Sequence, residues 1–181
     1  MAQVHAHMQD YEAHVRAVEE DLEYYRTKRL EPRILYLHRR GIVTLYDILR
    51  AFVRLAPTAA SAPPAAAASQ DLAQRIRALE DGLDEYVRGI ALTTIEVGGQ
   101  PLPIEETRKE RGDYDPFFRI AKKPHGGSLE ERVARLEQDL RDYTLLLQAF
   151  TRALVETGMV SEEQLAEQRA ALTGRGAWNG A

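Results

Sequence analysis

Three histidines near the start of the chain, His5, His7 and His14, are of a type that binds zinc or nickel. In a helix, His7 and His14 would share one face and His5 would point away from it. No acidic or cysteine ligand completes a recognisable metal-binding set beside them. We therefore interpret the three histidines as part of a solvated helix face, and we predict neither a metal nor another cofactor.

A basic stretch covers residues 26–40, and Tyr24, Tyr25 and Tyr36 are interleaved with it. Such a mixture could bind phosphates while the rings stack on bases, or lie on an anionic membrane surface. The net charge of −4 gives no general attraction to nucleic acid, so we keep both functions only as alternatives. The basic residues of the stretch are Arg26, Lys28, Arg29, Arg33, Arg39 and Arg40.

The residue types and motifs do not predict an enzyme. The chain of 181 residues has no cysteine, which excludes disulfides, thiolate zinc sites, iron–sulfur ligation and a cysteine nucleophile. Its carboxylates follow the solvent faces of predicted helices, and none forms an acid–base pair. The sequence has no phosphate loop, nucleophile elbow, zinc-protease motif or dinucleotide fingerprint. We predict a non-catalytic chain, which could still be a subunit of an enzyme.

The strongest pattern is a spacing of apolar residues that occurs three times. An apolar residue is followed three positions later by another and then Glu, four positions later by a third, and three positions later by Tyr. This spacing puts four side chains on one seam of a helix, as in helices that pack side by side. We expect these seams to form the interface with another molecule. Their members are Val15, Val18, Leu22, Tyr25, Ile76, Leu79, Leu83, Tyr86, Val133, Leu136, Leu140 and Tyr143.

The first and last copies of the pattern continue alike. Gly41 and Gly158 stand where a helix would end, because glycine adopts a left-handed turn without steric cost. Thr44 and Ser161 follow as N-caps of a second, short helix. The similarity indicates an internal duplication of a long helix, a corner and a short helix. Convergent helical patterning is the alternative explanation.

We predict a mainly α fold of long coiled-coil-type helices with short helical corners, and a small β-hairpin and an extended segment in the middle. Residues 92–97 are strand-like, and Gly98-Gly99 favours a turn. The predicted parts are a helical oligomerisation arm (1–56), an Ala/Pro linker (57–69), a helix plus an irregular partner-binding segment (70–127), a helix–turn–helix (128–172) and a disordered tail (173–181).

Large apolar residues also occur where no periodicity is visible. Phe117 and Phe118 lie in the irregular segment, and Trp178 lies in the tail. We expect the two phenylalanines to drape over a partner protein, against the alternative that they pack on the chain's own helices. Trp178 would either anchor a partner or remain an exposed ring.

Residues 146–172, with the helix, glycine corner and Ser161-Glu162-Glu163 helix start, resemble the helical arms of nitrile hydratase and thiocyanate hydrolase subunits. Residues 24–48 are a looser second match. The resemblance implies a structural or accessory chain that serves subunit association, because the cysteine motif of the catalytic subunits is absent here. The order of arm, linker and draping segment is also similar, without a shared motif, to stalk subunits of uptake hydrogenases.

We therefore predict a helical assembly or scaffold subunit that forms a homo-oligomer and clasps a larger protein. The acidic residues 10–25 followed by the basic residues 26–40 favour antiparallel pairing of two such arms. The start of the chain shows no signal peptide, and the longest uncharged stretch, residues 55–70, is too rich in Ala, Pro and Ser to cross a membrane. We expect a cytoplasmic location.

Overall fold

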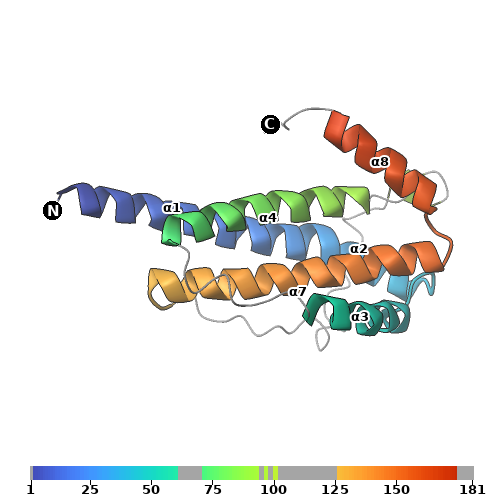
Figure 1. The fold of residues 1–181 in the computed structure, drawn as a ribbon. Coiled ribbons are helices and arrows are strands. Elements are labelled where there is room, and N and C mark those ends of the chain that lie inside the picture. Colours follow the sequence, from blue (N-terminus) through green and yellow to red (C-terminus); the bar gives the residue numbers. More distant parts are fainter. Residues whose placement is uncertain (1, 61–70, 94–95, 98–99, 102–125, 175–181) are drawn as a thin grey trace.

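The computed structural model is mainly helical, and it describes residues 2–60, 71–93, 96–97, 100–101 and 126–174 (Figure 1). Phe117, Phe118, Trp178 and most of the predicted linker lie outside these residues. The elements in chain order are the α-helix α1 (Ala2–Tyr25), the π-helical turn η1 (Arg26–Leu30), the α-helices α2 (Glu31–Arg39), α3 (Leu45–Ala60) and α4 (Leu72–Leu92), the strands β1 (Glu96–Val97) and β2 (Gln100–Pro101), and the α-helices α7 (Leu129–Glu156) and α8 (Glu162–Gly174).

Pro32 explains why a π-helical turn joins α1 to α2. Proline has no N–H to donate to the carbonyl of Lys28, and its ring would collide with that carbonyl in a regular α-helix. The widened turn avoids this conflict, because the N–H of Glu31 bonds the carbonyl of Arg26 five residues earlier. The helix therefore continues through the proline.

The helices α1, α4 and α7 pack on one another and run in the same direction (Figure 1). Gly82 of α4 faces Leu140 of α7, and Gly89 faces Leu147 one step further along. The two helices are therefore parallel. The corresponding residues of the repeated pattern lie at similar positions along the bundle axis.

The three seams are buried inside this single chain. All twelve residues belong to the core or pack against it, and only Tyr25 and Leu140 are partly exposed. The sequence predicted that another molecule covers these seams. The structure corrects this, because α1, α4 and α7 cover one another's seams at once. A coiled coil between chains is therefore not needed to bury them.

Two glycines let α4 and α7 approach closely, and we predict different effects of replacing them. A Cβ atom at Gly89 would lie 2.7 Å from Leu147 Cδ2, and one at Gly82 would lie 2.8 Å from Leu140 Cδ2. Leu147 is buried and cannot turn away, whereas Leu140 is partly exposed and can. We expect Gly89→Ala to lower the free energy of unfolding by about 1 kcal/mol, since overpacking outweighs the gain in helix propensity.

Gly82→Ala is the matched control for this prediction. We expect it to change the free energy of unfolding by no more than about 0.5 kcal/mol, because the gain in helix propensity offsets the movement of Leu140. Urea unfolding followed by circular dichroism would measure both variants. Equal stability of the two variants would contradict the proposed difference between Leu147 and Leu140.

The two glycine corners have the same geometry, as the repeat predicted. Gly41 has φ 66° and Gly158 has φ 75°. At the first corner the N–H of Ile42 bonds the carbonyl of Leu37, and at the second the N–H of Met159 bonds the equivalent carbonyl. Such a six-residue closure is typical of a helix that ends in a glycine.

The N-caps of the short helices are also confirmed. The Thr44 hydroxyl accepts from the N–H of Asp47, and the Asp47 carboxylate accepts from both the N–H and the hydroxyl of Thr44. Ser161 and Gln164 make the equivalent reciprocal pair. The short helices then pack differently, since α3 lies on α7 and α8 lies on α4.

The predicted oligomerisation arm shares one hydrophobic core with the rest of the chain. The core contains Val15 of α1, Ile48 of α3, Ile90 of α4 and Phe150 of α7. The Ala/Pro linker therefore separates these segments in sequence but not in packing. Among the described residues, β1 and β2 pair antiparallel over two residues each, and a β-hairpin as a folding element stays a prediction.

Candidate functional site

Of His5, His7 and His14, the structure describes the side chain of His14 alone. His14 of α1 contacts α4, because its Nδ1 lies 2.6 Å from Glu80 Oε1. Its Nε2 lies 3.6 Å from Asp10 Oδ1 on α1. No group of three metal-ligating side chains occurs in the part of the chain that the structure describes. The side chains of His5 and His7 lie outside that part. The contact of His14 links two helices at the protein surface.

The basic stretch does not form one surface, which corrects the prediction of a six-residue patch. Arg26 and Arg33 are each only 7% exposed, so neither can contact a phosphate or a lipid headgroup. Arg29 lies over the ring of Tyr24 and Arg40 lies over the ring of Tyr36. Cation–π contacts of this kind fix the side chains on the protein's own rings.

Arg26 occupies a buried polar centre between the three long helices. Its guanidinium donates to Glu31 at 3.0 Å and to Glu23 at 2.7 Å, and it lies 5.2 Å from the ring centre of Tyr143. Residues 26 and 31 would point to different sides of a regular α-helix, and the wider π-helical turn brings them together. Sequence reasoning missed Glu31 as a partner, and Pro32 was the available signal.

Electrostatics in this centre favour the charged arginine and neutral tyrosines. Burial would lower the pKa of Arg26, but the bond with Glu23 and the charge of Glu31 raise it above its ordinary value. Burial raises the pKa of Tyr143 to about 12, and burial also raises that of Tyr86. Both phenols stay protonated at neutral pH, so neither supplies a base. Within the described residues, Arg26 Nε and Tyr86 Oη have no hydrogen-bond partner.

Arg33 connects α2 to the end of α4. It donates to the carbonyl of Ile90 at 2.6 Å and to the hydroxyl of Thr93 at 2.9 Å. Burial, together with repulsion by Arg29, lowers the pKa of Arg33 to about 10. A cation at the C-terminus of a helix also complements the helix dipole. Arg33 is therefore a structural residue.

The acidic half of α1 likewise has partners in the same chain. Arg132 of α7 donates to both carboxylate oxygens of Glu19, at 2.9 and 2.7 Å, and also to Glu12. Between α4 and α7, Arg75 of α4 donates to both carboxylate oxygens of Glu137 at 2.8 Å. These bidentate pairs hold the parallel helices in register. Antiparallel pairing of two arms remains a prediction, but Glu12 and Glu19 are already paired within the chain.

The outer face of α3 is different, because it exposes large apolar side chains. Tyr46 is 71% exposed, Val53 62% and Leu49 46%. Their spacing of three and then four residues places them on one stripe of the helix, opposite the buried Ile48 and Ala51. We call Tyr46, Leu49 and Val53 the α3 stripe. Sequence reasoning missed it, although it follows the same spacing as the three seams.

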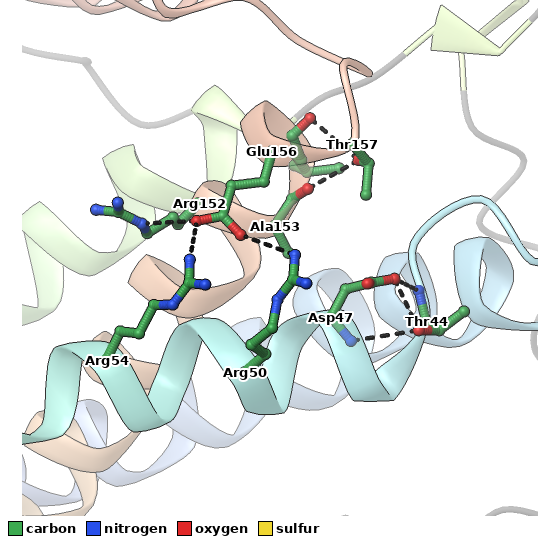
Figure 2. A network of polar contacts seen from close by, with 9 residues as sticks. Thr44, Asp47, Arg50, Arg54, Arg152, Ala153, Glu156 and Thr157 are labelled. Atoms are coloured by element: carbon green, nitrogen blue, oxygen red, sulfur yellow. Dashed lines mark hydrogen bonds and ion pairs between the residues drawn. The ribbon is translucent and has the colours of Figure 1, made fainter.

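Three arginines surround a single carboxylate beside this stripe (Figure 2). Glu156 of α7 lies 3.0 Å from Arg54, 3.4 Å from Arg50 and 3.1 Å from Arg152. The hydrogen bond from Arg152, followed by the charges of the other two arginines, lowers the pKa of Glu156. The cluster joins the last turn of α7 to the middle of α3, and we call it the Glu156 cluster.

Comparisons with protein-family models, with curated proteins and with solved structures found no match to this chain. The resemblance to nitrile hydratase arms and the analogy to hydrogenase stalk subunits thus stay predictions. Among the described residues, no helix is both long enough and apolar enough to cross a membrane.

Proposed function

We propose that this chain is a non-catalytic helical assembly subunit that docks on a larger protein through the α3 stripe. The observation that supports the proposal is the exposure of Tyr46, Leu49 and Val53 on a helix whose opposite face buries Ile48 and Ala51. Two helices associate through this spacing of apolar residues. Aromatic and aliphatic side chains that are exposed together on one face are typical of protein–protein interfaces.

The proposed function is the one that the sequence predicted, but the proposed binding surface is the α3 stripe and no longer the seams. The seams on α1, α4 and α7 are used inside the chain, so they no longer argue for oligomerisation. The rigid bundle that they form would instead position α3, which packs along α7. Ala51, Ala149 and Ala153 are fully buried, and such small side chains allow two helices to pack closely.

A capture experiment in extracts of the native host would test this function. The bait proteins are the wild type, Val53→Asp in the α3 stripe, and Ala134→Asp on an exposed position of α7. We expect the wild type and Ala134→Asp to recover the same partner in stoichiometric amount. Val53→Asp should lose it, because a carboxylate would be buried in an apolar contact.

Two controls make the result decisive. Circular dichroism should show that both variants remain folded, since both positions face solvent. Sedimentation velocity of the purified chain would show whether the bound copy is simply a second molecule of itself. Recovery of the partner by Val53→Asp at the wild-type level would contradict docking through the α3 stripe.

A further inference from the structure

The Glu156 cluster has an excess of positive charge. Arg50, Arg54 and Arg152 share the carboxylate of Glu156, and none of them has a second carboxylate within ion-pair distance in the described part of the chain. The charge of Asp47 also acts on Arg50, and the cluster still keeps a net positive charge, since three guanidinium groups lie near two carboxylates. The arginine side chains are 47%, 54% and 54% exposed, so an incoming anion can reach them.

This charge borders the α3 stripe. Arg50 lies four residues after Tyr46 and three before Val53, so the three side chains are neighbours on the helix surface. Arg54 lies one turn beyond Arg50, and Figure 2 shows both side chains reaching from α3 toward Glu156. A molecule that covers the stripe must therefore also approach guanidinium groups on one side of it.

We infer that the partner segment is an acidic amphipathic helix, which would lay apolar residues on the α3 stripe and carboxylates against Arg50, Arg54 and Arg152. This inference rests on the proposed function and names the chemistry of its partner. The 3–4 spacing of the stripe matches the apolar seam of a second helix. Arginine binds carboxylates in a bidentate manner, and such bonds gain strength when the contact excludes water.

An ordinary structural role of the arginines does not account for the whole arrangement. Cations near the C-terminus of α7 suit its helix dipole, and the pair Arg152–Glu156 is one helical turn apart. Exposed ion pairs of this kind contribute little to stability. They also do not explain why three large apolar side chains are exposed next to them.

Labelled helical peptides of about four turns would test the inference on the full chain. All peptides carry Leu at alternating spacings of three and four residues, and their flanking positions are Glu in one, Gln in the second and Lys in the third. Fluorescence anisotropy should show that the Glu peptide binds at least about tenfold more tightly than the Gln peptide, while the Lys peptide binds most weakly. The preference should shrink at high salt.

Charge reversal gives the sharper result. The double variant Arg50→Glu, Arg54→Glu should reverse the order of the peptides, so that the Lys peptide binds more tightly than the Glu peptide. Arg77→Glu is the matched control, because Arg77 is an exposed arginine on α4, and it should keep the wild-type order. Leu49→Asp should weaken binding of every peptide, since it places a charge in the apolar contact.

The outcomes separate the inference from the proposed function. Equal binding of the three peptides, or an unchanged order in the double variant, would overturn an acidic partner helix. The native partner could then still be captured through Val53, and the proposed function would stand. Binding of the wild type to phosphatidylglycerol vesicles but to none of the peptides would also overturn the inference, because the ligand would be a membrane surface.

Discussion

Leu136→Asp is expected to unfold the isolated chain. Leu136 lies on the seam of α7, only 5% exposed, between the parallel helices. Removing a buried leucine side chain already costs about 2–5 kcal/mol. The carboxylate would in addition lose its water without gaining a partner. The total is comparable with the 5–15 kcal/mol that typically stabilise a folded domain.

Urea unfolding followed by circular dichroism would measure the stability of the variant. Gel filtration would show whether the chain elutes as a monomer. Ala134→Asp, two residues earlier on the solvent side of α7, should stay within about 0.5 kcal/mol of the wild type. The prediction separates two uses of the seam. A Leu136→Asp variant that stays fully folded and only loses self-association would show that the seam serves another molecule.

The second large effect concerns the buried pair of Arg26 and Glu31. Arg26→Leu is expected to lower the free energy of unfolding by about 3–5 kcal/mol, because it removes one partner from a buried ion pair. Glu31→Leu should have a smaller cost, since Arg26 keeps its bond with the half-exposed Glu23. The same unfolding experiments would measure both variants.

A double-mutant cycle makes this prediction specific. Arg26→Leu combined with Glu31→Leu should cost less than the sum of the two single variants, with a coupling of about 1–3 kcal/mol. Arg132 offers a contrast, since one of its two carboxylate partners, Glu12, is 40% exposed. Additive effects of the Arg26 and Glu31 substitutions would show that the two side chains do not act as a pair in solution.

The ends and starts of several helices could be predicted from the sequence. Gly41 and Gly158 end helices in the left-handed conformation, and Thr44 and Ser161 begin the next helices with reciprocal caps. Each of these devices involves residues at most five positions apart, so the local spacing in the sequence largely fixes their geometry in space. The prediction of a mainly helical chain is confirmed for the same reason.

The candidate site was harder to predict, because its residues are brought together across elements. The Glu156 cluster joins Arg50 and Arg54 to a residue about one hundred positions away. The basic stretch appeared as one surface because its members are adjacent in sequence. Only the packing of the three helices shows that Arg26 and Arg33 point inward while others remain at the surface.

The sequence by itself determined which side chains share a face of each helix, because the period of the α-helix is a local property of the backbone. The tertiary structure decided what covers each face. The seams of α1, α4 and α7 cover one another, and the α3 stripe with the same kind of spacing stays exposed. The spacing of apolar residues is the same for a contact within a chain and for a contact between chains. Only the packing of the helices in the folded chain shows which of the two contacts forms.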